Sequence, residues 1–334
     1  MSSARTCNLC ILLVCGCFGF IISFVGIWHY SYGMWKTTNG SHIIIKHDFN
    51  GTVSPFPLFS STPPTSNLPN RWTDSDYQLW KQEKYFPPNK PRGSIVYMVM
   101  TGDRNLRSRG DVMMCTFGMT LHPSRLFFVG EASSDRRLPV YDVVPRLTRR
   151  PVDYTGSMQK LAQGLALVTN KINNGSYKNE INWIMVMDDD TFVTPQNLEP
   201  LASEHDHRRS LMIGTATCGV GFCGGAGYLI SRALFDQFPK FIKKCRPIPG
   251  YPQSDQFVPA CIKRKTQVEF ITRPEFHSQP PAVYSSEEKP QDHPDSLARA
   301  VTFHFVKPAE NYISLWELQQ THINGRVNKI NLHT

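Results

Sequence analysis

The longest uncharged apolar stretch of the chain covers residues 7–28. Only Asn8 and Ser23 are clearly polar within it, and its length is close to the ~20 residues that a helix needs to cross a bilayer core. Backbone polar groups in lipid must be satisfied within the segment, so such a stretch predicts a helix. Tyr30 and Trp35 follow at the level expected for a membrane interface.

We interpret this stretch as a signal-anchor transmembrane helix that leaves residues 1–6 as a cytoplasmic tail. A cleaved signal peptide is the competing interpretation, but its apolar core is usually ~7–15 residues long and ends at a small-residue cleavage site. Glycosylation sequons begin at Asn39, Asn50 and Asn174, all after the stretch, and they are usable only in the lumen. These features predict a single-pass type II membrane protein.

The segment that follows, residues 29–91, is rich in Pro, Ser, Thr and Asn and has few periodic apolar positions. Such a segment buries too little apolar surface to offset its ordering entropy, which is typical of an extended stem. Trp72, Tyr77 and Trp80 are exceptions, and they predict that the end of the stem docks on the next domain. We expect that lumenal domain to cover residues 92–334.

Short continuous apolar runs alternate with helix-like stretches within this domain. Residues 94–100, 126–129 and 181–187 form runs without polar alternation, as expected for strands buried on both faces of a parallel sheet. Residues 109–119 are helix-like, and residues 156–172 repeat apolar positions at steps of three and four. This alternation predicts an α/β domain with a mostly parallel central sheet.

The composition of the 334-residue chain, with 40% apolar and 19% charged residues, is that of a globular protein. It excludes a wholly disordered, collagenous or coiled-coil chain. The formal net charge of +9 could suggest a nucleic-acid ligand. The sequence has no basic–aromatic module, and a lumenal domain does not meet nucleic acid, so we predict no such partner.

The nine cysteines divide into four near the membrane and five in the domain. An oxidising lumen favours pairing. The nearest pairs in the sequence are Cys218 with Cys223 and Cys245 with Cys261, which would leave Cys115 unpaired in a buried helix. Other pairings stay open, because sequence alone does not give connectivity.

Three consecutive carboxylates, Asp188, Asp189 and Asp190, follow the third apolar run. Ligands collect at the carboxyl ends of strands in open α/β sheets. Adjacent carboxylates repel one another, and their position after an apolar strand is costly unless a cation compensates. Oxygen ligands suit hard ions such as Mg²⁺ and Mn²⁺, which could bridge the protein to a diphosphate. The alternative is a solvated acidic turn or a helix N-cap before Thr191.

A glycine-rich segment, Gly-Gly-Ala-Gly at 224–227, precedes an apolar run at 228–231 and a helix-like stretch at 232–241. Small residues let backbone approach a ligand closely, although a tight turn is the alternative. Residues 219–224 also match the pattern GxGxxG. This match lies late in the domain, and no clear βαβ unit with a ribose-binding acid follows, so we do not interpret it as a dinucleotide site.

Two further polar residues stay ambiguous on spacing alone. Asp255 lies beside aromatic residues and could act as a general base, or it could be a surface or helix-cap residue. His304 lies in the segment 302–305, where polar and apolar residues alternate as in a half-buried strand. A lone histidine there is more often a core residue than a metal ligand.

Four motifs occur in order: Asp-Asp-Asp-Thr-Phe-Val at 188–193, Gly-Gly-Ala-Gly-Tyr-Leu-Ile-Ser at 224–231, Ser-Asp-Gln-Phe-Val-Pro-Ala-Cys at 254–261, and Thr-Phe-His-Phe-Val at 302–306. Together they resemble glycosyltransferase family 31, in particular the branch of the Fringe proteins and core 1 β1,3-galactosyltransferases. Arg109, followed by Thr116-Phe117, and Lys160 in the next helix also agree with that family. The resemblance covers about residues 92–318.

The resemblance implies a GT-A fold, a Golgi membrane location, a UDP-sugar donor and Mn²⁺. It implies inverting transfer of galactose or N-acetylglucosamine to an O-glycosylated protein acceptor, with a β1,3 linkage. Asp190 and His304 are then the metal ligands, and Asp255 is the base on the acceptor hydroxyl. Asp188 and Asp189 hold the nucleotide ribose and the waters of the metal. The other residues implied to bind the donor are Thr101, Arg109, Lys160, Gly225 and Ala226. A homodimer is left open.

The sequence departs from the family pattern at three positions. Phe117 stands where the family has Trp, Ser254 where it has an acidic residue, and Pro259 where Gly is common. These departures affect the base and the acceptor loop and leave the acidic triplet intact. They motivate a second hypothesis, a non-catalytic lumenal chaperone or binding protein with the same fold. A plain adhesive ectodomain is a third hypothesis, and it leaves the strand-end acids unexplained.

Overall fold

The structure of the chain is a computed structural model that describes two short strands and most of the chain from residue 72 to residue 321. The described residues are 45–47, 53–55, 72–86, 92–131, 133, 137–144, 154–215, 221–245, 254–281, 299–307 and 311–321. The predicted membrane anchor at 7–28 lies outside them. Within these ranges no helix combines the length and the apolar character needed to cross a bilayer.

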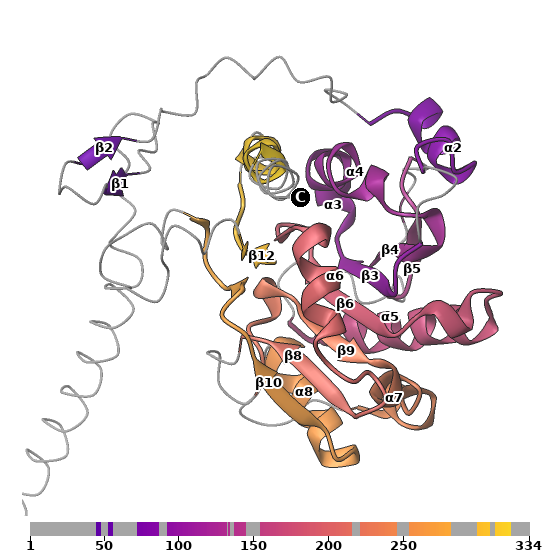
Figure 1. The fold of residues 1–334 in the computed structure, drawn as a ribbon. Helices are drawn as coiled ribbons and strands as arrows, with labels where there is room; N and C mark the ends of the chain where they lie inside the picture. The colour runs from indigo at the N-terminus through magenta and orange to yellow at the C-terminus, as the bar shows by residue number, and fades with distance from the viewer. Residues whose placement is uncertain are drawn as a thin grey trace, which may run out of the picture. The chain divides into compact units, whose positions relative to one another are not determined.

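A seven-stranded sheet runs through the domain (Figure 1). In spatial order its strands are β10 (Glu269–Thr272), β8 (Leu211–Gly214), β9 (Tyr228–Ser231), β6 (Trp183–Asp188), β3 (Ile95–Met100), β4 (Leu126–Gly130) and β5 (Val140–Asp142). β6, β3, β4 and β5 pair in parallel, and so do β10 and β8. β9 is antiparallel to both of its neighbours. The predicted α/β architecture with a mostly parallel sheet is therefore confirmed.

The three apolar runs predicted as buried strands are β6, β3 and β4, which lie side by side in the sheet. Almost every residue in them is buried. Along β3, Tyr97 and Val99 face one core cluster, whereas Val96 and Met98 face the other. This alternation, the period-2 pattern of a strand, gives the sheet an apolar core on each face.

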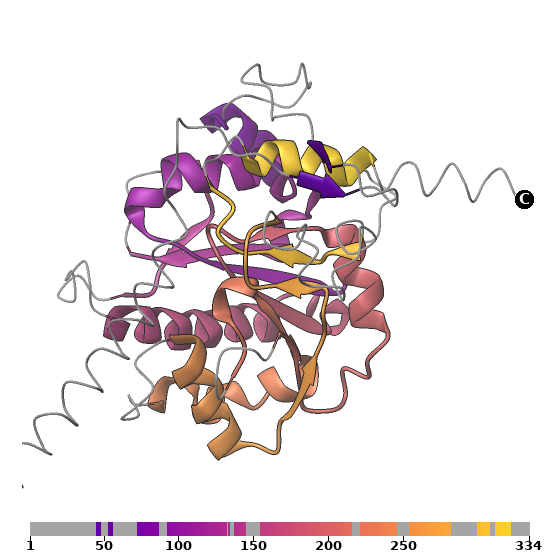
Figure 2. The same cartoon turned by 90° about the vertical axis from the view of Figure 1, so that its left-hand side faces the viewer.

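Helices cover both faces of the sheet, as Figure 2 shows. One core cluster includes side chains of α2, α4 and the helical residues 311–321, and the other includes side chains of α5, α7 and α8. The α-helices are α2 (Asp74–Lys81), α3 (Asp103–Asn105), α4 (Asp111–Cys115), α5 (Tyr154–Asn174), α6 (Pro195–Ser203), α7 (Arg232–Phe235) and α8 (Ser254–Lys265). Short 3-10 turns lie between other elements, such as Gly118–Thr120 after α4 and Gly224–Ala226 before β9.

α5 confirms the helix predicted from the apolar repeat at 156–172. Its residues Met158, Leu161 and Leu165 are buried against the sheet. Gly164 lies on the same side, where an added Cβ would meet Val129 Cγ2 at 3.0 Å. α5, which lies between β5 and β6 in the sequence, therefore packs closely on β4 of the sheet.

Two helix-like stretches of the sequence are shorter or shifted in the structure. The stretch 109–119 belongs to a helical segment that begins earlier, with α3 and a π-helical turn, Leu106–Gly110, before α4. The stretch 232–241 contains only α7, followed by a 3-10 turn at Phe238–Lys240. Pro239 explains the second difference, because a proline disfavours helical geometry at the residue before it.

The end of the predicted stem packs into the domain. Trp72 and Trp80 are almost fully buried, and both belong to the core cluster that contains α4. Their indole N–H groups donate to the carbonyl oxygens of Arg137 (2.8 Å) and Leu121 (3.0 Å). Buried indoles need such partners, so this region is a completed docking contact, as predicted. The predicted domain boundaries stay predictions.

A small three-stranded sheet brings the last strand of the domain beside the acidic triplet. It consists of β11 (Phe276–His277), β12 (Thr302–Phe303) and β7 (Phe192–Val193). β12 is antiparallel to β7, with Phe303 opposite Phe192. The loop after β12 therefore begins next to the turn that precedes β7. A separate two-stranded antiparallel sheet is formed by β1 (Ile45–His47) and β2 (Val53–Pro55).

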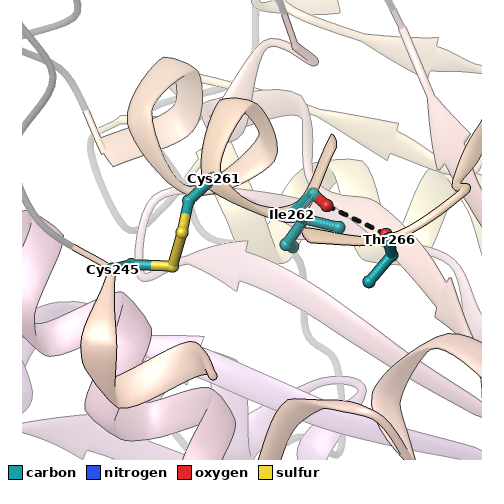
Figure 3. The surroundings of a disulfide bond; sticks show 4 residues. All are labelled: Cys245, Cys261, Ile262 and Thr266. Carbon is teal, nitrogen blue, oxygen red and sulfur yellow. Dashed lines mark hydrogen bonds between the residues drawn. A yellow bond between two sulfur atoms is a disulfide. The ribbon is translucent and has the colours of Figure 1, made fainter. Parts of the chain in front are cut away.

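Cys245 and Cys261 form a disulfide that joins the end of the 3-10 turn Ile242–Lys244 to α8 (Figure 3). Their Cα atoms are 5.9 Å apart, and 16 positions separate them in the sequence. Closing a loop of this length removes unfolded-chain entropy worth about 3 kcal/mol. The pair was predicted, and so was the free, buried Cys115. Cys223 is also disulfide-bonded, and its predicted partner, Cys218, lies outside the described residues.

Candidate functional site

The acidic triplet lies where two central parallel strands end. Met100, the last residue of β3, is in register with Asp188, the last residue of β6. The N–H of Asp189 donates to the carbonyl oxygen of Met100 (3.1 Å), and a turn follows in which Thr191 N–H donates to Asp188 (3.1 Å). Asp189 and Asp190 are buried, with 5% and 6% exposure. The chain therefore presents three carboxylates at the carboxyl edge of the sheet.

Protein donors hold Asp189 from several directions. Its Oδ2 accepts hydrogen bonds from Thr101 Oγ1 (2.8 Å) and Asn105 Nδ2 (3.0 Å). Its Oδ1 pairs with the guanidinium of Arg109. Such charge-assisted bonds compensate for the burial of this carboxylate. Asp189 thus fixes the first helical segment against the end of β6.

The π-helical turn explains how the first helical segment reaches the triplet. Asn105 lies just before the turn and Arg109 lies within it, and both contact Asp189. Single π turns inside helices occur frequently at functional sites. Here the π turn connects α3 to α4. Only Thr101 and Gly102 separate α3 from the end of β3.

Two side chains of the loop after β12, together with Arg109, lie close to Asp190. Lys307 Nζ lies 2.6 Å from Asp190 Oδ2, and His304 Nε2 lies 3.5 Å from Asp190 Oδ1. Arg109 Nη1 is 3.5 Å from the same Oδ2. Burial alone would raise the pKa of Asp190, but the hydrogen bonds with His304 and Lys307 outweigh it and hold the pKa well below its usual range.

Asp188 has the opposite electrostatic environment. Burial, followed by repulsion from Asp190, raises its pKa to about 7, and His304 offsets only part of this rise. Asp189 and Asp255 contribute further repulsion. A carboxylate in such surroundings gains from a nearby cation, and strongly perturbed acids of this kind are concentrated at functional sites.

Asp188, Asp190 and His304 could hold a metal ion together. Each offers one ligand atom, and these atoms lie within 4.8 Å of one another. Carboxylate oxygens are the ligands preferred by hard divalent ions such as Mg²⁺ and Mn²⁺, and imidazole nitrogen is common at transition-metal sites. The crowding that raises the pKa of Asp188 is what a bound cation would relieve. The donor set therefore fits a divalent ion.

The glycine-rich segment packs directly against two of the predicted site residues. An added Cβ on Gly225 would overlap the imidazole ring of His304, and one on Gly224 would overlap the side chain of Asp255. Hydroxyl groups fix the backbone of this segment, because Thr191 donates to the Gly225 carbonyl (2.7 Å) and Thr302 to the Ala226 carbonyl (2.6 Å). Glycine here permits the close approach that places His304 beside the triplet.

Asp255 lies in the first turn of α8 and faces the glycine segment. Its Oδ2 accepts a hydrogen bond from the N–H of Gly224 (3.2 Å). Asp255 also helps to raise the pKa of the buried Tyr228 and of Asp188. The carboxylate is therefore oriented by the backbone and lies within electrostatic range of the triplet.

Lys160 reaches the end of β3 from α5. Its Nζ donates to the carbonyl oxygen of Thr101 (2.6 Å) and lies 3.3 Å from Glu131 Oε1. The N–H of Asp103 also donates to Glu131 (3.3 Å). This network holds the loop between β3 and α3, which in turn carries Asn105 and Arg109.

The structure brings nearly all of the predicted site residues to one edge of the sheets. Contacts link Thr101, Lys160, Arg109 and the triplet on one side, and the triplet with the glycine segment, Asp255 and His304 on the other. Their individual roles stay predictions.

Sequence reasoning missed two residues whose side chains contact the carboxylates of the triplet, Asn105 and Lys307. Lys307 follows His304 by only three positions, and this spacing was a usable signal. Asn105 gave none, because its position depends on the π turn.

Comparison with known proteins identifies the family of the chain. The family model described as Fringe-like matches residues 93–324, more than half of the 334-residue chain. One similar solved structure is the "crystal structure of a glycosyltransferase involved in the glycosylation of the major capsid of PBCV-1". Its identity to this chain is 12%, the alignment covers 66% of this chain and 98% of that chain, and the TM-score is 0.37. That similarity is too distant to support an argument.

The match to the Fringe-like model confirms the family resemblance seen in the sequence motifs. The Fringe-like family is part of the glycosyltransferase family 31 group. The matched range contains all of the predicted site residues, from Thr101 to His304. The chain therefore belongs to the Fringe-like family of glycosyltransferases.

Proposed function

We propose that the chain is an inverting β1,3-glycosyltransferase that moves galactose or N-acetylglucosamine from a UDP-sugar to a hydroxyl of an O-linked glycan on a glycoprotein. The observation that carries the proposal is the group of Asp188, Asp190 and His304 at the carboxyl edge of the sheet, in a chain of the Fringe-like family. A GT-A classification of the α/β domain belongs to the same proposal.

Asp188, Asp190 and His304 are the residues that would hold Mn²⁺, which would supply positive charge to the UDP leaving group. This assignment adds Asp188 to the two ligands predicted from the sequence. Asp189 contributes by fixing Arg109 and the loop after β3. Positive groups of the chain, Arg109 among them, attract the diphosphate to this edge.

Asp255 is the proposed base. It accepts the proton of the acceptor hydroxyl while that oxygen bonds to C1 of the donor sugar. The bond between C1 and the UDP oxygen breaks, and UDP leaves with the electron pair. Attack and departure on opposite faces of C1 invert the anomeric configuration. The hydrogen bond from Gly224 to Asp255 supports this role, because it orients the carboxylate beside the triplet.

The test is a donor and acceptor screen with the purified full-length chain. UDP-galactose and UDP-N-acetylglucosamine are each offered with Mn²⁺ and peptides that carry O-fucose or O-GalNAc. We expect one donor–acceptor pair to give a β1,3-linked product, and we expect EDTA or Asp255→Asn to abolish it. Transfer that is unaffected by EDTA would contradict the metal assignment, and an α-linked product would contradict inversion.

A non-catalytic lumenal chaperone or binding protein is the second candidate. Ser254 and Pro259, which flank Asp255 in α8, differ from the family pattern, and they favour it. It predicts binding of UDP in the presence of Mn²⁺, measured by calorimetry, without transfer from any donor in the screen. Detection of product would reject it directly.

We also propose a Golgi membrane location with a lumenal domain. The uncharged stretch 7–28 supports it, and so does the exposed Asn174 at the end of α5, which begins a sequon. In cells, Asn174→Gln should remove one N-glycan and increase mobility on a gel. If the mobility does not change after Asn174→Gln, and glycosidase also has no effect on the wild type, the lumenal topology is wrong.

A further inference from the structure

The loop after β12 contacts Asp190 at three points. His304 Nε2 approaches its Oδ1 (3.5 Å), Lys307 Nζ pairs with its Oδ2 (2.6 Å), and the N–H of Val306 donates to its carbonyl oxygen (3.2 Å). Because the backbone bond fixes the loop, the lysine side chain starts within reach of the carboxylate. The pairing with Lys307 thus follows from the fold of this loop.

Phe305 has an unusual backbone conformation, and its ring contacts both His304 and Lys307. It has a positive φ of 56°, a conformation that is unfavourable for a residue with a side chain. The left-handed residue lies between His304 and Lys307, and both of these side chains reach Asp190. The ring of Phe305 packs on the ring of His304, and Lys307 Nζ lies 5.2 Å from its centre. Strained residues of this kind cluster at ligand sites and switch regions.

The ammonium of Lys307 competes with a divalent ion for the same carboxylate. A doubly charged cation bound at Asp190 would repel the ammonium of Lys307 and weaken this ion pair, because like charges repel. Lys307 can give way, since its side chain is 44% exposed and a lysine is a point charge on a flexible stem. His304 is more enclosed, with 15% exposure, and it supplies a neutral ligand atom instead.

We propose that Lys307 is a displaceable counter-ion of the site. Without metal it neutralises Asp190, and when a divalent ion binds it leaves the carboxylate and turns to the diphosphate of the nucleotide. The inference rests on the proposed function for the identity of the metal and the nucleotide. It assigns to one residue two effects of opposite sign, against the metal alone and in favour of the metal–nucleotide complex.

The first measurement is binding of Mn²⁺ alone to the full-length chain, followed by the EPR signal of the free ion. Lys307→Met removes the charge and keeps the length of the side chain. We expect it to bind Mn²⁺ roughly three- to tenfold more tightly than the wild type, because the competing ion pair is lost. Lys263→Met is the matched control, because Lys263 also lies over an aromatic ring (Phe270, 6.0 Å) but on the last turn of α8. This control should bind Mn²⁺ like the wild type.

The second measurement is binding of UDP at saturating Mn²⁺, by calorimetry. Lys307→Met should bind UDP roughly tenfold more weakly, because a charge-assisted contact to the diphosphate is lost, and Lys307→Arg should recover part of the affinity. Equal or weaker Mn²⁺ binding by Lys307→Met, while the wild type binds the ion, overturns the inference alone. No Mn²⁺ binding by either chain overturns the metal assignment and the inference with it. Unchanged UDP affinity overturns the second step.

Discussion

Two regions of the domain bury charged side chains, and they balance the charge differently. Under the docked α2 region, Arg137 Nη1 pairs with Asp111 Oδ2 (3.0 Å) and also donates to the carbonyl oxygen of Trp72 (2.7 Å). At the edge of the sheet, three consecutive aspartates meet Arg109, Lys307 and His304, and the pKa of Asp188 still rises to about 7. In the first region a carboxylate is paired with a guanidinium, and in the second several carboxylates are crowded together.

This difference separates a structural use of buried charge from a functional one. A matched buried pair gains little over an apolar contact, but breaking it leaves an uncompensated charge, so the pair is needed for stability. Excess carboxylates are unfavourable in the chain by itself and become favourable when a cation is added. Variants of the region around Arg137 should therefore change the free energy of unfolding, whereas variants of the triplet should change metal affinity and activity.

The largest effect is expected for Asp190→Asn. The change removes a proposed metal ligand, so the initial rate of UDP release should fall roughly 1000-fold. Its free energy of unfolding should change by less than about 1 kcal/mol, because the loss of the pair with the half-exposed Lys307 is offset by weaker repulsion of Asp188. A variant that is fully active, or one that unfolds, would break the comparison.

The next effect is expected for Asp111→Asn, which keeps the size of the side chain and removes the carboxylate that pairs with Arg137. Breaking a buried pair should reduce the free energy of unfolding by about 3 kcal/mol, measured by urea denaturation. Mn²⁺ affinity should stay at the wild-type value, since neither residue contacts the triplet in the described structure. A loss of Mn²⁺ affinity in folded protein would show that the two regions are coupled.

A smaller effect should follow Gly225→Ala. The added methyl group overlaps the ring of His304, which must turn away from Asp190. Mn²⁺ affinity should fall roughly 10- to 100-fold, the range seen when support for a metal ligand is lost. Gly164→Ala is the control, because its Cβ would crowd Val129 and Met98 in the other core. That change should cost about 1 kcal/mol of stability and leave Mn²⁺ affinity unchanged.

The smallest effect concerns Cys115, which lies in α4 on the structural side of the comparison. Burial, with repulsion from Asp111, raises the pKa of its thiol to about 12. The thiolate is therefore scarce at pH 8, and iodoacetamide should leave the peptide that holds Cys115 unmodified in native protein. Denaturant should expose it to rapid alkylation, detected by mass spectrometry. Rapid modification without denaturant would show that α4 opens locally.

The central strands could be predicted from the sequence because β3, β4 and β6 are continuous apolar runs buried on both faces. The direction of β9 could not, since its residues 228–231 carry no signal for antiparallel pairing between β6 and β8. Helix boundaries near Arg109 were also missed, because no pattern in the sequence marks the π turn at Leu106–Gly110, from which Arg109 contacts Asp189. The local pattern of apolar residues therefore indicates which segments are buried. The direction of a strand and the type of a turn depend on residues that are distant in the sequence.

The candidate site was predictable to the extent that motifs carried it. The triplet, Gly225 and Asp255 stand out in the sequence, and the structure gathers them at one edge. The contacts of Lys307 and Asn105 with the triplet arise from long-range pairing, and only Lys307 had a signal in the sequence, its spacing from His304. β12 must lie against β7 before Lys307 can reach Asp190, and those segments are more than one hundred residues apart.

Phe305 has a consequence for which sequences this site tolerates. A left-handed residue with a side chain costs about 1–2 kcal/mol, so glycine at 305 would make the isolated domain more stable. Glycine would also let the backbone between His304 and Lys307 relax and would remove the ring that contacts both. A selection for thermostable variants should therefore favour Phe305→Gly. In that variant His304, the proposed metal ligand, should be held less firmly beside Asp190. At position 305 glycine would favour the stability of the domain, whereas phenylalanine favours a precise arrangement of the site.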